Sequence, residues 1–275
     1  MNLFSALFKK KSKKIKIGIA LGSGGAKGFA ELGVLYAFEQ NGIEFDYVAG
    51  TSIGSIVGAF LANGYTSTEI YELMQRVEAK DVLGSFAIKL GSSSLFNLIE
   101  KNINSLNIEE LKKPFAAIAT EVESGKEKVF RDGSVAKALC ASSSYPPFFK
   151  PVEIDGTYYK DGAFTNSIPA DVVKEMGADY VIGVDLSHSD TITEGLTKIL
   201  TFKGRDEGEK VKQFVKDVGS EKGYTYADIM LIPNLVGYSA LSFASGAKMY
   251  DIGYKCAIEK MPQILSEIQK LKKKK

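Results

Sequence analysis

Ser52 is the first candidate for chemistry, because it lies in the sequence Gly50-Thr51-Ser52-Ile53-Gly54. This Gly-x-Ser-x-Gly pattern follows a short run typical of a strand and leads into a run typical of a helix. A serine on such a sharp turn is held in a strained conformation, and glycines are needed where a Cβ would strike the neighbouring backbone. The helix N-terminus also stabilises a developing alkoxide. This context indicates that Ser52 is a nucleophile.

A glycine-rich loop, residues 22–28, joins an expected strand at 15–21 to an expected helix at 26–40. Its backbone N–H groups are not shielded by side chains, and the helix dipole favours negative charge, so the loop is typical of an anion site. The anion is either a standing phosphate, as in a nucleotide-binding scaffold, or a transient oxyanion of acyl transfer. The two common glycine fingerprints of nucleotide sites are both absent.

Topology places this loop beside Ser52. The strand at 15–21, the helix at 26–40 and a second strand at 47–50 form one βαβ unit. Its right-handed crossover puts both following loops at the carboxyl edge of the same sheet. We therefore expect the N–H groups of Gly24 and Gly25 to form an oxyanion hole for an ester attacked by Ser52.

A serine nucleophile needs a base, and two candidates are present. His188 is the single histidine, and the order Ser52, an aspartate, His188 suits the triad of an α/β-hydrolase. Asp161 is the alternative, at the end of a hairpin-like segment at 152–160 and followed by Gly162. An Asp-Gly pair by itself is typical of a turn, so the residues alone leave both bases open.

Four blocks in order resemble the patatin-like phospholipase family, from about residue 15 to residue 186 and more loosely through 227–258. The resemblance implies a three-layer α/β/α fold with a mostly parallel central sheet. It also implies hydrolysis of lipid acyl esters by a Ser-Asp dyad without histidine, and neither a cofactor nor a metal. The blocks are residues 24–28, 50–54, 141–151 and 161–163.

The resemblance assigns Ser52 as nucleophile and Asp161 as base. A solvated aspartate, with a pKa of about 3.9, is a feeble base toward a hydroxyl. We therefore expect Asp161 to sit in a desolvated pocket that raises its proton affinity. The aromatic residues Tyr145, Phe148 and Phe149 either line that pocket or are core residues around a proline-stiffened turn.

The resemblance also implies that the amides of Gly24 and Gly25 hold the oxyanion. Lys27 matches a family position that is Arg or Lys, where it orients the glycine loop or meets a phosphate head group. Ser23 departs from the usual first glycine of this block. The remaining motif glycines are Gly28, Gly50, Gly54 and Gly162.

Composition limits the other function classes. The 275 residues are 45% hydrophobic and can bury one sizeable core, and no apolar run reaches the roughly 18 residues of a membrane-spanning helix. Two cysteines, Cys140 and Cys256, and one histidine argue against a disulfide scaffold or a zinc site. Residues 1–16 and 270–275 hold eleven lysines and no acid, so the net charge of +2 becomes −9 without them. An acidic body argues against nucleic-acid binding.

The charge pattern also divides the chain. We expect a basic amphipathic tail at 1–14, one patatin-like domain at 15–270 and a basic tail at 271–275. Residues 189–226 are polar and form a surface helix, an insertion or a lid. The first tail carries apolar residues ahead of its lysines, the reverse of a secretory signal. We expect a cytoplasmic protein that binds an anionic membrane surface through its tails and acts on a lipid acyl ester, while the oligomeric state stays open.

Overall fold

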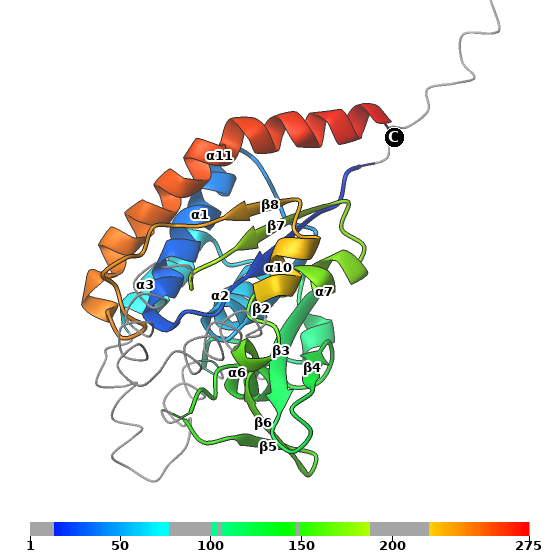
Figure 1. Ribbon diagram of the computed structural model, residues 1–275, viewed down its shortest axis with the longest axis vertical. Helices are drawn as coiled ribbons and strands as arrows, with labels where there is room; N and C mark the ends of the chain where they lie inside the picture. The colour runs from blue at the N-terminus through cyan, green and yellow to red at the C-terminus, as the bar shows by residue number, and fades with distance from the viewer. Residues whose placement is uncertain are drawn as a thin grey trace, which may run out of the picture.

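The computed structural model describes residues 14–76, 99, 101–103, 106–146, 149–187 and 220–274. Eight strands in this part of the chain form one sheet (Figure 1). Five of them pair in parallel in the order β3-β2-β1-β7-β8. Their bounds are β1 Ile17–Leu21, β2 Tyr47–Thr51, β3 Phe115–Glu121, β7 Tyr180–Val184 and β8 Ile229–Leu231. Strands β1 and β7 are buried along their whole length, as expected for a sheet covered on both faces.

Three antiparallel strands extend the sheet beyond β3. They are β4 (Glu127–Phe130), β5 (Val152–Ile154) and β6 (Thr157–Asp161). Strands β5 and β6 form the hairpin predicted at 152–160, and β4 and β6 both pair with β3. Because β4 and β2 overlap along β3, they occupy its two opposite edges. Because β6 overlaps with β4, β6 lies on the same edge as β2.

Helices cover both faces of the sheet and give the three layers that the sequence predicts. One face carries α1 (Gly28–Gln40), α2 (Ile53–Ala62), α3 (Ser67–Gln75), α6 (Val135–Ser142) and α11 (Gly246–Lys274). The other face carries α7 (Ala170–Glu175) and α10 (Ser220–Tyr226). Short 3-10 turns lie at Gly25–Lys27, Ile108–Glu110, Gly162–Phe164 and Phe243–Ser245.

Helix α1 is buried on nearly every side, because α11 packs along it and covers the face that the sheet leaves open (Figure 1). Glycines allow this close approach. A Cβ on Gly33 would clash with the backbone of α11 at Tyr250, and a Cβ on Gly253 would clash with the backbone of α1 at Ala30. The C-terminal helix is therefore part of the domain core along its first turns.

The predicted elements agree with the structure except at their ends. The first strand begins at Ile17 rather than at residue 15, and the first helix begins at Gly28 after a 3-10 turn. Helix α10 lies inside the 189–226 segment, whose residues 189–219 are outside the described part. Residues 1–13 also lie outside it, so the division into tails, domain and lid stays a prediction.

Within the described ranges, no helix is both long enough and apolar enough to cross a membrane.

Candidate active site

The turn between β2 and α2 holds Ser52 in a strained conformation. Its φ of 56° and ψ of −124° lie in a region that non-glycine residues rarely adopt, and the residue is only 9% exposed. The flanking glycines are required, since a Cβ on Gly50 would clash with the carbonyl of Gly54 and a Cβ on Gly54 with the carbonyl of Leu21. The structure thus gives the Gly-x-Ser-x-Gly pattern the sharp turn that its spacing predicts.

Two neighbouring serines fix this turn. The Ser52 backbone N–H donates to Ser142 Oγ at 2.9 Å, and Ser55 Oγ donates to the Ser52 carbonyl at 2.7 Å. Ser142 lies within one of the motif blocks, but the sequence alone assigns it no role. The only signal for it is the run of three serines, Ser142 to Ser144, at the end of α6.

Strand register brings Asp161 to Ser52 from the opposite direction. Strands β2 and β6 pair with successive parts of the same edge of β3. The last pair between β2 and β3 is Thr51 with Ile118. At the next residue of β3, Ala119 pairs with Asp161 of β6. The last residue of β6 therefore meets the end of β2. Gly162 is needed at this junction, because a Cβ there would clash with the carbonyl of Ile118.

The Asp161 carboxyl is fully buried. Its Oδ1 accepts the Ala163 N–H at 2.8 Å, while Oδ2 has no hydrogen-bond partner among the described residues. Burial raises the pKa of Asp161 to about 7, although the Ser52 side chain and the Ala163 N–H each favour the charged form. The group therefore has the raised proton affinity that a carboxylate base requires, with one oxygen available for a proton.

Of the three aromatic residues expected around Asp161, the structure describes Tyr145 and Phe149. Tyr145 is 43% exposed and stacks on Phe164, so the prediction that it is a core residue is wrong. Phe148 lies outside the described residues. Two hydrogen bonds hold the backbone of Asp161: its N–H donates to the Ser144 carbonyl, and its carbonyl accepts from Thr120 Oγ1.

The glycine loop lies beside the Ser52 turn, as topology predicts. A Cβ on Gly28 would clash with Ile53, so α1 and α2 begin side by side. The N–H groups of Gly24 and Gly25 make no hydrogen bond to a described residue, and both glycines are only half-buried. They are therefore available as donors to a carbonyl oxygen at Ser52.

The loop is anchored by residues that belong to none of the motif blocks. Ser23 N–H donates to the Ser167 carbonyl at 3.1 Å, and Ala26 N–H donates to the Ala240 carbonyl at 2.8 Å. Gly25 has a φ of +58°, and a Cβ there would lie 2.6 Å from the Ala240 oxygen. A segment more than two hundred positions downstream thus shapes the loop, which local sequence cannot reveal.

Lys27 is buried to 4% exposure in the same loop. Burial lowers the pKa of its ammonium group, and the nearby charge of Asp185 opposes that shift. Asp185 Oδ2 in turn accepts the Tyr224 hydroxyl at 2.6 Å, and its Oδ1 accepts from Ser187. Asp185, which directly follows β7, thus interacts with both the glycine loop and α10.

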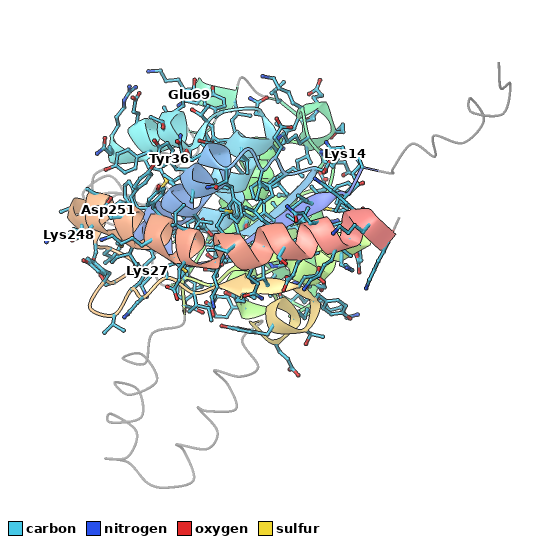
Figure 2. All side chains as sticks on the ribbon, turned by 90° about the horizontal axis from the view of Figure 1, so that it is seen from above. Lys14, Lys27, Tyr36, Glu69, Lys248 and Asp251 are labelled. Atoms are coloured by element: carbon cyan, nitrogen blue, oxygen red, sulfur yellow. The ribbon has the colours of Figure 1, made fainter. Side chains whose placement is uncertain are left out.

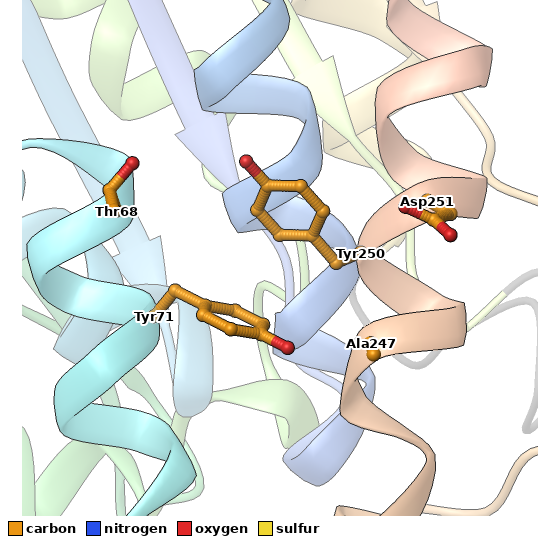
Figure 3. Close-up of a pocket in the computed structure, with 5 residues that line it drawn as sticks. All are labelled: Thr68, Tyr71, Ala247, Tyr250 and Asp251. Atoms are coloured by element: carbon orange, nitrogen blue, oxygen red, sulfur yellow. The ribbon is translucent and has the colours of Figure 1, made fainter.

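Two hollows lie away from this site. One, of about 280 Å³, lies between α3 and α11 and is lined by Thr68, Tyr71, Ala247, Tyr250 and Asp251 (Figure 3). The other, of about 420 Å³, lies at the β5-β6 hairpin next to Val122 and Tyr158. No group of three His, Cys, Asp or Glu side chains in the described part is placed to hold a metal. His188 lies outside that part, so the triad alternative is not tested by the geometry.

Comparison with known proteins agrees with this fold and motif order. VipD from Legionella pneumophila has a similar fold, with a TM-score of 0.53 at 14% sequence identity over 91% of this chain and 67% of VipD. A family model described as patatin-like phospholipase matches residues 19–174. The chain belongs to the patatin-like phospholipase family. The matched range contains both the Ser52 turn and Asp161.

Other members of the patatin-like phospholipase family are longer than this chain. Mouse patatin-like phospholipase domain-containing protein 6 is 27% identical over 271 residues, which cover 86% of this chain and 20% of the mouse protein. An uncharacterized NTE family protein of Mycobacterium bovis is 31% identical over 191 residues, covering 68% of this chain and 53% of that protein. The chain thus spans about half of the mycobacterial relative and a fifth of the mouse relative.

Proposed function

We propose that this protein is a serine acyl hydrolase that cleaves fatty-acyl esters of lipids with a Ser52-Asp161 dyad. The observation that carries the proposal is a fully buried carboxyl, with a pKa raised to about 7, that meets a strained serine at the end of the neighbouring strand. Family membership supports the substrate class, because the matching family is described as patatin-like phospholipase.

In the proposed reaction, Ser52 Oγ attacks the acyl carbonyl carbon while Asp161 Oδ2 takes its proton. The N–H groups of Gly24 and Gly25 stabilise the resulting oxyanion. The carbon–oxygen bond to the alcohol then breaks, and Asp161 returns the proton to the leaving oxygen. A water molecule then gives a proton to Asp161 and attacks the acyl-serine. The bond between the acyl carbon and Ser52 Oγ breaks, Asp161 returns the proton to Oγ, and the fatty acid leaves.

The pKa of Asp161 predicts the acidic limb of the pH profile. The base must be charged to accept a proton, so we expect kcat/KM to rise with pH and to level off above about pH 7. Below that pH, kcat/KM should fall by about tenfold per pH unit. The measurement is kcat/KM for a nitrophenyl ester between pH 5 and 8. A profile that is flat across pH 6 to 8 would show that Asp161 is not the titrating base.

A panel of lipids tests the proposed activity itself. Phospholipids, lysophospholipids, acylglycerols and acyl thioesters are incubated with the wild-type protein and with Ser52→Ala, and the products are identified by mass. We expect release of free fatty acid from at least one class by the wild type alone. If no member of the panel yields free acid with the wild type, the proposed activity is wrong.

We also propose that the basic ends bind an anionic membrane surface. Both ends leave the domain at the amino edge of the sheet, opposite Ser52. Lys16 N–H donates to Asp179 just before β7, and Glu267 of α11 accepts the Tyr180 hydroxyl at the first residue of β7. Figure 2 likewise shows Lys14 near the end of α11 and Lys27, in the glycine loop, toward its beginning. The points where the two ends join the domain are thus separate in space from the proposed active site.

This separation predicts that deleting residues 1–13 weakens binding to anionic vesicles and changes hydrolysis of a soluble ester by less than about twofold. Vesicle sedimentation and ester turnover are measured on the same preparations, with uncharged vesicles as the control surface. Equal sedimentation of the full chain and the truncated chain on anionic vesicles would contradict the membrane proposal without affecting the dyad.

A further inference from the structure

A carboxyl group outside the proposed dyad lies fully buried beneath the glycine loop. Glu31 is in the first turn of α1, its side chain is 0% exposed, and neither carboxyl oxygen has a hydrogen-bond partner among the described residues. Side chains in a helix point back toward its N-terminus, and α1 begins directly after the loop. A buried carboxyl without a hydrogen-bond partner lowers the stability of the folded state. We therefore expect Glu31 to have a function.

The surroundings of Glu31 hold no compensating cation among the described residues. The backbone N–H of Gly22, where β1 enters the loop, favours the charged form of Glu31 without meeting the geometry of a hydrogen bond, so the carboxyl lies near the loop. Burial outweighs that contact and raises the pKa of Glu31 well above its ordinary value. Helix α2 contributes no titratable side chain. Ring contacts bring Tyr71 of α3 and Tyr250 and Tyr254 of α11 to α1, and the cation Lys27 directly precedes this helix.

None of these four groups pairs with Glu31. Lys27 interacts with Asp185, and the three tyrosines contact Phe29, Tyr36 and one another. Burial without a partner therefore favours the protonated form of the carboxyl. A neutral carboxyl can accept a hydrogen bond from a backbone N–H through its carbonyl oxygen. It can also donate its own O–H to a backbone carbonyl, so it can interact with both kinds of backbone group.

We propose that Glu31, in its protonated form, is a positioning residue that supports the glycine loop from below, and that loss of its proton disables the oxyanion site. A charge at this position would compete for the loop N–H groups and would oppose the negative charge that develops on the substrate oxygen. The inference rests on the proposed function, because it assigns a role to a residue behind the same site.

The expected signature is a second limb in the pH profile. Activity rises as Asp161 loses its proton and falls again at higher pH as Glu31 loses its own. The fall belongs to kcat rather than to KM, because the oxyanion forms only after the substrate is bound. A purely structural role for Glu31 would change the unfolding temperature without changing this limb.

The test compares Glu31→Gln and Glu31→Met in the full chain, with Leu32→Met as a control for repacking the buried face of the same helix. We measure kcat and KM for a nitrophenyl ester between pH 5 and 10, fluorophosphonate labelling of Ser52, and the unfolding temperature. Glu31→Gln keeps a neutral polar group, so we expect kcat within about threefold of wild type at neutral pH and no alkaline fall. We expect Glu31→Met to lower kcat by about 100-fold with KM nearly unchanged, and Leu32→Met to retain the wild-type profile.

Three results would overturn the inference: wild-type kcat in Glu31→Met, an alkaline fall that persists in Glu31→Gln, or a wild-type profile that stays level to pH 10. If Glu31→Met does not fold, the Glu31→Gln profile decides alone. Failure of the proposed function is a different result, since the wild type would then show neither Ser52 labelling nor ester hydrolysis at any pH.

Discussion

Replacing Asp161 with asparagine is expected to lower kcat/KM for ester hydrolysis by at least about 10³-fold. The amide has nearly the same shape, and its oxygen can still accept the Ala163 N–H at the Oδ1 position. It cannot accept a proton from the Ser52 hydroxyl, so the attack step loses its base. The measurement is turnover of a short-chain nitrophenyl ester at pH 8, with circular dichroism to show that the fold persists.

The same variant is expected to be more stable than the wild type. Burial raises the pKa of the folded Asp161 from 3.8 to about 7, so the folded state favours the protonated form. The contribution of Asp161 to the free energy of unfolding is therefore fully present below pH 3.8. It is lost as the pH rises to about 7. The asparagine side chain carries no charge at any pH, so the gain is larger at pH 8 than at pH 5 and is on the order of a few kcal/mol.

Urea unfolding of both proteins at pH 5 and pH 8 measures this gain. We expect Asp161→Asn to lose activity and to gain stability, and the gain should grow with pH. A substitution that only disrupts core packing would lower stability instead. Retention of most wild-type activity by Asp161→Asn would exclude Asp161 as the base.

Replacing Ser52 with glycine is expected to remove all measurable hydrolysis while stabilising the fold. The φ of 56° at Ser52 costs a residue with a Cβ on the order of 1 to 3 kcal/mol, and glycine adopts it freely. Part of this gain is offset, because glycine loses more conformational entropy on folding. We expect a net gain of about 1 kcal/mol for Ser52→Gly.

Ser52→Ala is the matched control for this prediction. Alanine also lacks the nucleophile but keeps the Cβ, so the two variants should be equally inactive and should differ in stability. The free energy of unfolding of each is measured by urea titration beside the wild type. Equal stability of Ser52→Gly and Ser52→Ala would show that the backbone of this turn stores no strain.

The sequence predicts those parts of the site that depend on local pattern and short crossovers. The β1-α1-β2 unit has a fixed handedness, so the glycine loop and Ser52 can be placed together from the sequence alone. Asp161 is different, because the residues by themselves do not exclude His188 as the base, and the family resemblance decides for Asp161. The contact depends on β6 taking over from β2 along β3, a register between segments far apart in the chain.

Residues that support the site from a distance could not be identified in the same way. Asp185 and Glu31 lie in no motif, and Ser142 lies in a motif block that assigns it no role. The partners of Ser142 and Asp185 come from other elements of the fold, and Glu31 has no hydrogen-bond partner among the described residues. Glu31 in particular occupies a helix whose apolar residues point in all directions, so no pattern separates its side from the others. Burial and the packing of α11 over α1 decide its environment, and both are tertiary properties.

Labelling with a fluorophosphonate probe, followed by mapping of the adduct by mass spectrometry, tests the central claim most directly. The probe reacts only with an activated serine, and the wild type, Asp161→Asn and His188→Ala are compared at pH 8. The account predicts an adduct on Ser52 in the wild type and in His188→Ala, and little or none in Asp161→Asn. An adduct that is lost in His188→Ala and kept in Asp161→Asn would contradict it.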